Sequence, residues 1–533
     1  MTVRLFRAVL SIIVFCLLTS EGFAQVDPGV RGGLQNTGGG LQAQGKRIPP
    51  PPIISPNPTS EAGITENEKL SFFEGILRAG QLESSCDQCA MVTDGSPAVK
   101  NPLNGLRELD PLFPQFTTNS NGLGARHNAD QCFVCHGHPL LGGSGGFLVP
   151  NPVDLARFGP AAARPPENPQ FNLVPHRFGK QNTVPSFEQQ YGPIREVRFI
   201  YKVDGNGDIL RDGSGSPIPD GGVHQLWTVR GIQNDPTIPS CSISQPNFEK
   251  QVQQQNVAFR IPLQMLGLGL IDSIPDREIL ARQAATASQR AALGIAGQPN
   301  RSGNDGTITR FGWKAQNKSL TMFSGEAYNV EMGITNELFP TATEEDPNCN
   351  GSQKPEPNDV TRMDTNDGIN QSFNNPLHIL ADWMQFTLLM RFTDGPQPDP
   401  KPSSSAIRGS TVFGSIGCAL CHTPTMQTAR VMNSAVLQDR PVNLFSDLLV
   451  HDMGVGLADG ISQGHAGPRE FRSTPLWGVG QRIFFLHDGR TSDLLAAILA
   501  HRSNGSEANA VVDAFDDLPT SDKQAILNFL RAL

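Results

Sequence analysis

Two copies of the pattern Cys-x-x-Cys-His constrain this 533-residue chain more than any other feature. In each copy the two thiols stand about one helical turn apart, where both can add to the vinyl groups of one haem, and the histidine that follows can bind its iron. A zinc site needs four ligands, and a disulfide gives no reason for a histidine after the second cysteine. The pattern therefore predicts two covalently bound c-type haems. Its residues are Cys132, Cys135, His136, Cys418, Cys421 and His422.

The first 24 residues have the layout of a secretory signal peptide. Arg4 and Arg7 precede an apolar run at 8–18, and Gly22-Phe23-Ala24 resembles a cleavage site. The run is too short to span a bilayer and no later stretch is long enough, so we expect an exported protein, periplasmic or extracellular, without a membrane span. Residues 25–62 are Gly-rich and then Pro-rich, which predicts a linker.

The composition argues against several classes of protein. With 54 Gly, 43 Pro, 17% charged and 38% hydrophobic residues, the chain suits a loop-rich globular protein and neither a coiled coil nor a disordered chain. A formal net charge of −9 and the lack of a basic cluster exclude nucleic acid as an expected partner. The length predicts more than one domain.

We expect a mainly α fold with two cytochrome c-like haem domains. The N-terminal haem domain is assigned to residues 63–402 and contains a β-containing insertion at about 195–305, where the runs 197–201 and 225–229 suggest a hairpin. A helix is predicted at 276–292, after a proline.

The C-terminal cytochrome c domain is assigned to residues 403–533. Gly409 and Phe413 precede the second haem motif, as in the first helix of a small cytochrome c. The last helix carries an apolar face and is predicted to open with a capping box at Ser521–Gln524. We expect these two helices to pack together.

Several longer segments resemble the bacterial di-haem cytochrome c peroxidase superfamily, in particular its di-haem oxidoreductase branch, whose members are often labelled peroxidases or thiol oxidoreductases. In that superfamily the N-terminal haem reacts with peroxide and the C-terminal haem delivers electrons to it. The resemblance implies a haem-dependent oxidoreductase that reduces a small-molecule oxidant such as hydrogen peroxide, with a small redox protein or a quinol-linked donor as its electron source. The segments are Asn182–Phe187, Arg310–Ala315, Glu331–Thr335, Asp447–Gly454, Phe471–Trp477 and Phe485–Arg490.

The same resemblance assigns roles to three further residues. Glu331 matches the distal acid/base carboxylate, which can move a proton between the two peroxide oxygens. Trp313 matches the tryptophan between the haems, and His487 is placed beside the C-terminal haem without binding iron. A surface position for Glu331 and simple core packing for Trp313 are the alternatives.

The second iron ligand of the C-terminal haem departs from the family pattern. Where the family's peroxidases carry methionine, this chain has His501, and a His/His pair lowers the reduction potential relative to His/Met. Met453 is the alternative ligand, and a solvated role for His501 is the other possibility. For the N-terminal haem, His127, His138 and His176 are candidates in turn-rich stretches, so we expect an open or loosely capped iron.

The cysteines outside the two haem motifs and the acidic loops are the remaining candidates for a functional site. Cys86 and Cys89 are expected to form a structural disulfide, although a redox-active pair would suit oxidation of a thiol or sulfur compound. Cys241 and Cys349 are free to pair. Calcium occurs in the resembled family, so a calcium site is possible. The loop at 204–215 and the segment 482–484 lack the residues that calcium binding needs, so the sequence does not support such a site. A non-catalytic electron carrier is the alternative function.

Overall fold

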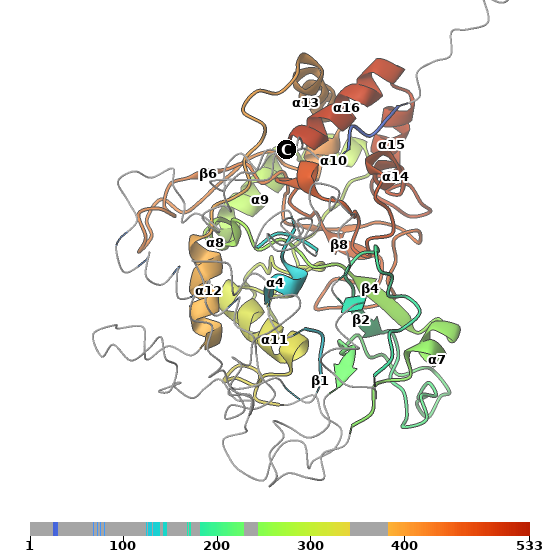
Figure 1. Ribbon diagram of the computed structural model, residues 1–533. Coiled ribbons are helices and arrows are strands. Elements are labelled where there is room, and N and C mark those ends of the chain that lie inside the picture. Colours follow the sequence, from blue (N-terminus) through green and yellow to red (C-terminus); the bar gives the residue numbers. More distant parts are fainter. Residues whose placement is uncertain are drawn as a thin grey trace, which may run out of the picture.

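The computed structural model of the chain describes residues 25–29, 126–129, 132–138, 142–145, 182–228, 243–341 and 382–533, with single positions from 65 to 79 and at 124, 168, 170 and 171. The described residues form helices and four two-stranded sheets (Figure 1). This content agrees with the predicted mainly α class. No helix in these ranges is long and apolar enough to cross a membrane. The helices are α4 (Cys132–Cys135), α7 (Phe248–Gln253), α8 (Leu268–Asp272), α9 (Asp276–Ala285), α10 (Ala287–Ala292), α11 (Leu320–Met332), α12 (Asp382–Phe392), α13 (Ser404–Ser415), α14 (Leu494–Leu499), α15 (Asn509–Asp516) and α16 (Thr520–Ala532), with 3-10 turns η5 (Cys418–Leu420) and η6 (Val479–Gln481).

All four sheets are antiparallel pairs. The pairs are β1 (Arg126–His127) with β3 (Trp227–Thr228), β2 (Glu196–Phe199) with β4 (Val257–Arg260), β5 (Met426–Gln427) with β6 (Pro441–Val442), and β7 (Val450–Asp452) with β8 (Glu470–Arg472). The two runs of the predicted hairpin do not pair with each other, because they belong to different sheets; the first run instead forms antiparallel bridges from Arg198 to Val223 and from Tyr201 to Pro219. The intervening segment folds on itself instead: the Asp204 and Asp212 carboxylates accept backbone N–H groups and close local turns.

Helices α13 and α16 cross at close range (Figure 1). A Cβ atom at Gly409 would lie 1.9 Å from the carbonyl oxygen of Ala525, so this crossing requires glycine. The rings of Phe413 and Phe529 then pack edge to face at 5.4 Å. The predicted capping box is wrong: α16 begins at Thr520, after Pro519, which fixes a φ suited to a helix start.

The segment at 25–29 lies against α16 (Figure 1). Val26 exchanges two hydrogen bonds with the side-chain amide of Gln524, and Asp27 forms a two-bond ion pair with Arg531. The beginning of the predicted linker is thus fixed to the last helix; residues 30–62 lie outside the described residues.

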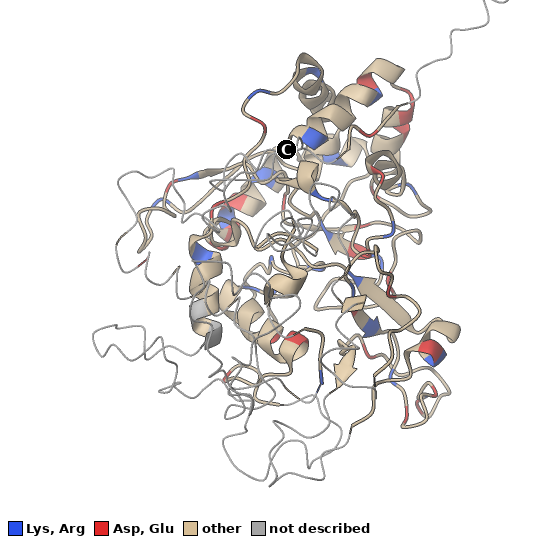
Figure 2. Cartoon of the chain, in the orientation of Figure 1, with Lys and Arg blue, Asp and Glu red and all other residues tan. Residues whose placement is uncertain are grey.

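A buried ion network joins β4 to the segments that precede β8. Asp459 pairs with Arg260 at 2.9 Å and with Lys314 at 3.0 Å, and all three side chains are at most 3% exposed. Lys314 also donates to two backbone carbonyls and lies over the ring of Phe471. Elsewhere, acidic and basic residues are interspersed over the described elements (Figure 2). The helix predicted at 276–292 is present as α9 and α10, divided at Thr286.

Candidate haem sites

The first Cys-x-x-Cys-His motif is built on the single turn α4, which places both thiols on one short helix. Cys135 is a free thiol. The loop at 142–145 folds back on the motif, and the carbonyl oxygen of Gly143 lies 3.1 Å from Nδ1 of His136. When Nδ1 carries the hydrogen and donates it to a carbonyl, Nε2 keeps its lone pair for a metal. Burial lowers the pKa of His136 to about 4, so the imidazole is neutral, as a ligand must be.

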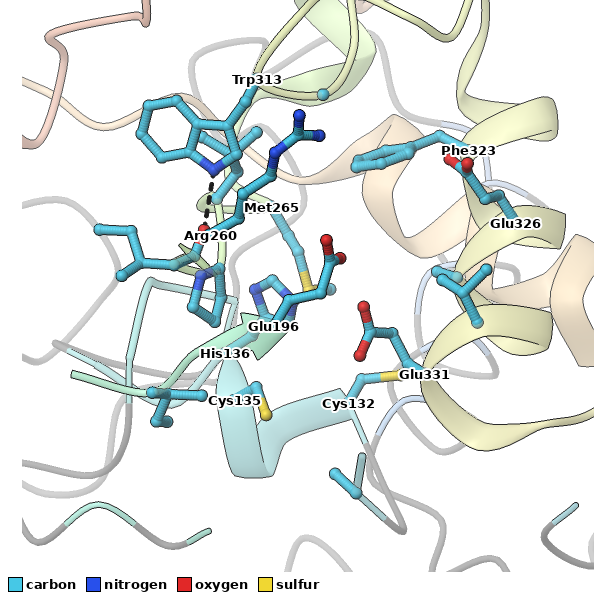
Figure 3. A pocket seen from close by; sticks show the side chains of 18 of the residues that line it. Cys132, Cys135, His136, Glu196, Arg260, Met265, Trp313, Phe323, Glu326 and Glu331 are labelled. Atoms are coloured by element: carbon cyan, nitrogen blue, oxygen red, sulfur yellow. Dashed lines mark hydrogen bonds between the residues drawn. The ribbon is translucent and has the colours of Figure 1, made fainter. Parts of the chain in front are cut away.

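A cavity with about 1160 Å³ of empty space, part of it open to solvent, adjoins this motif. Its walls bring together Cys132, Cys135 and His136 with Trp313 and Glu331 (Figure 3). The structure thus gathers in one cavity the predicted ligand of the first haem and both predicted catalytic residues. Most of the remaining wall is apolar, as a haem requires, and includes Ile194, Ile261, Met265, Leu268, Phe323, Phe386 and Met390.

Glu331 reaches the cavity because α11 ends immediately after it. Met332 is buried, and Gly333 stops the helix with a φ of +67°, where a Cβ atom would lie 2.3 Å from the carbonyl oxygen of Arg126. The side-chain amide of Asn128 donates to Oε2 of Glu331 at 2.8 Å. The Glu-Met-Gly pattern is therefore a helix end that aims a carboxyl group into the cavity.

A second carboxylate, Glu196 on β2, was missed by the sequence analysis. Its carboxyl group and that of Glu331 point toward one another (Figure 3). Burial and then the charge of Glu196 raise the pKa of Glu331 well above its ordinary value. Burial also opposes ionisation of Glu196, but Arg198 and Arg260 outweigh it and lower the pKa of that carboxyl group. Burial and the charge of Glu196 thus favour the protonated form of Glu331, whereas the two arginines favour the ionised form of Glu196.

The one sequence signal for Glu196 was its position two residues before Arg198 in an apolar strand. Side chains at i and i+2 share a face of a strand, and the two form an ion pair there. That pattern is too common to identify a site by itself.

Trp313 begins a row of three aromatic rings at the cavity wall. Its indole N–H donates to the carbonyl oxygen of Ile261 at 2.9 Å. The ring of His487 meets it edge-on at 6.3 Å and stacks on Phe471 at 4.3 Å. His487 is 5% exposed, and burial lowers its pKa to about 4. A row of three rings therefore connects the cavity wall to β8.

The second motif lies on η5, with Cys418 and Cys421 as free thiols. The Nδ1 atom of His422 lies 3.3 Å from the carbonyl oxygen of Phe445, the same carbonyl arrangement as at the first motif. Burial and then His501 lower the pKa of His422 to about 4.

His501 follows α14 and lies close enough to His422 to affect its ionisation. Its Nδ1 atom is 2.8 Å from the carbonyl oxygen of Ala497. Met453 instead packs with Ile261, Trp313 and Phe471, away from the cluster around Cys418. Of the two candidates for the second ligand, the structure places His501 near His422.

Of the three candidates for a further ligand of the first haem, the two described ones, His127 and His138, do not line the cavity. His138 is turned away, with Nε2 2.8 Å from the carbonyl oxygen of Gln481, and His127 lies on β1 beside the carbonyl oxygen of Gly124. His176 and the cysteines Cys86, Cys89, Cys241 and Cys349 lie outside the described residues.

The fold and the sites define a haem-binding oxidoreductase. A family profile described as "Di-haem oxidoreductase, putative peroxidase" matches residues 216–533, and the chain belongs to this family. The match contains Trp313, Glu331 and the second motif, whereas the first motif precedes it.

Two other comparisons, with curated proteins and with solved structures, do not change this family assignment. No curated protein matches the chain. Among solved structures, hydrazine synthase of Kuenenia stuttgartiensis, pressurised with xenon, is similar at 16% identity with a TM-score of 0.20, over 28% of this chain and 55% of that chain. This chain thus spans about half the length of that structure, and so low a TM-score supports no statement about fold or function.

Proposed function

We propose that the protein is an exported di-haem c-type cytochrome that reduces hydrogen peroxide or a related oxidant in the cavity of the first motif. The observation that carries the proposal is the position of Glu331: a carboxyl group kept protonated by burial shares one cavity with Cys132, Cys135 and His136. A carrier that only passes electrons needs no buried proton donor beside its cofactor.

In this proposal each motif anchors one haem in a cytochrome-like unit. Cys132 and Cys135 hold the first haem covalently, with His136 as its iron ligand. Cys418 and Cys421 hold the second, with His422 and His501 as ligands. Bound haem supplies the redox chemistry, namely binding of the oxidant and delivery of electrons to it.

The chain itself supplies protons. Reduction of one hydrogen peroxide to two waters consumes two electrons and two protons. Glu331 gives its proton to the departing oxygen, and Asn128 holds the carboxyl group in place through Oε2. The ionised Glu196 beside it favours return of a proton to Glu331 after each turnover.

Electrons enter through the haem of the second motif from a small redox protein or a quinol-linked donor, and the row of Phe471, His487 and Trp313 ends at the cavity of the first motif. The His/His ligand pair gives the entry haem a lower potential than a His/Met pair would. This favours transfer of electrons onward to a strong oxidant.

Replacement of Glu331 by Gln tests the proposal. We expect peroxide turnover to fall by roughly 10²–10⁴-fold, the usual contribution of a general acid, while covalent haem content stays the same. Glu278→Gln is the control, because Glu278 lies on α9 outside the cavity and pairs with Arg282. Unchanged turnover would remove the acid/base role.

An EPR spectrum tests the function as a whole. No high-spin signal in either the oxidised or the half-reduced protein would favour a non-catalytic electron carrier. Steady-state reduction of the haems by sulfur donors, lost in Cys86→Ala, would instead indicate a thiol or sulfur-compound oxidoreductase.

A further inference from the structure

The buried arginines that the structure describes differ in their partners. Most of them have a carboxylate partner, which compensates the cost of taking a guanidinium out of water. Those pairs are Arg198 with Glu196, Arg260 with Asp459, Arg290 with Asp447, Arg310 with Asp276 and Arg531 with Asp27. Arg472 and Arg482 are equally buried, but no described carboxylate forms an ion pair with either.

Arg482 follows η6 and reaches the loop of the first motif. It is 9% exposed, and its Nη2 donates to the hydroxyl of Ser144 at 3.2 Å, whereas its Nε has no acceptor. Ser144 belongs to the same loop whose Gly143 holds His136. A buried cation with one neutral acceptor therefore lies beside the predicted ligand of the first haem.

Arg472 ends β8 and is 6% exposed. Its Nε donates to the carbonyl oxygen of Gly312 at 3.0 Å, and its backbone N–H donates to that of Trp313 at 2.8 Å. Gly312 and Trp313 both line the cavity of the first motif. The second unpaired cation thus also contacts a wall of that cavity.

An uncompensated buried charge is strongly destabilising, so two of them near one site indicate that an anion belongs there. A haem carries two propionate carboxylates, and arginine is the residue that best matches a carboxylate. We propose that Arg472 and Arg482 are the counter-ions of haem propionates. This inference rests on the proposed binding of haem at the two motifs.

The proposal also explains why both arginines come from the chain after the second motif while their contacts, Ser144 and Gly312, come from the chain before it. A propionate held by Arg472 or Arg482 would join the two parts of the molecule through the cofactor. Loading with haem would then stabilise their contact.

The direct test is redox-difference infrared spectroscopy of the holoprotein carrying haem labelled with ¹³C at the propionate carboxylates. We expect the labelled carboxylate bands to shift in Arg482→Gln and in Arg472→Gln, and to shift by a smaller amount in Arg482→Lys, which keeps the charge. Arg469→Gln is the control, because Arg469 is half exposed and pairs with Asp452. Labelled bands that are the same in all variants would overturn the proposal.

Potentiometric titration identifies which of the two haems carries the propionate that pairs with each arginine. A guanidinium beside a haem favours the reduced state, so its removal should lower the midpoint potential of that haem. A shift confined to the first haem assigns the propionate to it, and a shift confined to the second assigns it there. Wild-type potentials that depend on phosphate concentration, with a dependence lost in the variants, would assign the site to a free anion and overturn the proposal.

The outcomes separate this inference from the proposed function. A wild-type protein without covalent haem would refute the function, whereas unchanged bands and potentials in haem-loaded variants refute only the role of the arginines. Should the Gln variants fail to fold, Arg482→Lys decides: its charge is retained but its two-pronged geometry is lost, so the labelled bands must still move if the pairing exists.

Discussion

Arg531 holds Asp27 through two hydrogen bonds, from Nε to Oδ1 at 2.7 Å and from Nη2 to Oδ2 at 2.6 Å. The backbone N–H of Leu494 donates to the same carboxylate at 3.0 Å. Both side chains of the pair are at most 11% exposed. One aspartate close to the start of the described chain is thus bound to α16 and to the beginning of α14, two helices that pack in the apolar cluster around Cys418.

Replacement of Asp27 by Asn should lower the free energy of unfolding by about 1–2 kcal/mol at neutral pH, because Arg531 loses its charged partner. Urea unfolding measures the change. Glu278→Gln, which breaks an exposed pair within one helix, should cost only about 0.3–0.5 kcal/mol. Equal effects of the two substitutions would mean that the contact of Asp27 is dispensable.

The same pair predicts a pH dependence. Burial opposes ionisation of Asp27, but Arg531 and the N–H groups of Gly29 and Leu494 outweigh it and lower the pKa below 3.8. The unfolded chain therefore binds this proton more readily, so the stabilisation is complete above the unfolded pKa and is lost as the pH falls through the folded one. Wild type and Asp27→Asn should differ at pH 7 and converge below pH 3.8.

Gly409→Ala should destabilise the protein, because a methyl group there would meet the carbonyl oxygen of Ala525 at 1.9 Å and force α13 and α16 apart. We expect a loss of about 1–3 kcal/mol. Gly414→Ala on the same helix meets nothing within 4 Å and should gain about 0.5–1 kcal/mol. Thermal unfolding of both variants checks the contrast, and equal signs would contradict it.

Local patterns were sufficient for part of this structure. The helical content, the helix at 276–292 and the pairing of the helix that carries Gly409 and Phe413 with the last helix were all predicted. Local patterns could not predict which distant strands pair with one another. Each predicted strand of the hairpin found another partner, because turns closed by Asp204 and Asp212 fold the intervening chain on itself.

In the candidate site, too, residues that belong to a sequence motif could be predicted, and residues brought together only by tertiary structure could not. Cys132, His136, Trp313 and Glu331 could be predicted, since each belongs to a motif. Glu196 could not, because its function depends on β2 pairing with β4, which brings Arg260 beside it. Arg472 and Arg482 could not be singled out from the sequence either, because only the tertiary structure shows that no described carboxylate forms an ion pair with them.

Replacement of Glu196 by Gln should shift the pH dependence of peroxide turnover. Burial and the charge of Glu196 raise the pKa of Glu331, so loss of that charge lowers it. Glu331 donates only when protonated, and turnover should therefore begin to fall at a lower pH than in wild type. A pH–rate profile measures this, with Glu278→Gln as control. A shift to higher pH would show that Glu196 does not act through its charge.

His501→Met should raise the midpoint potential of the C-terminal haem by on the order of 100 mV, a fraction of the roughly 0.8 V range that axial ligands span. Thioether stabilises ferrous iron better than imidazole does. Potentiometry and the loss of a His/His low-spin EPR signal report the change. Met453→Leu is the comparison, because Met453 packs with Trp313 and Phe471; a potential that responds to this variant and not to His501→Met would reverse the ligand assignment.

Trp313→Phe separates packing from electron relay. The variant keeps an aromatic ring against His487 but loses the hydrogen bond to Ile261, which costs about 1 kcal/mol of stability. If Trp313 relays electrons, transfer from the second haem to the first should slow in Trp313→Phe and slow further in Trp313→Leu, which removes the ring. Stopped-flow spectroscopy of the half-reduced protein measures the transfer rate directly. Phe323→Leu, on the opposite cavity wall in Figure 3, removes a ring without touching the row of Trp313, His487 and Phe471. A rate that follows the stability of the variants, and not the presence of the ring at 313, would leave Trp313 a packing residue.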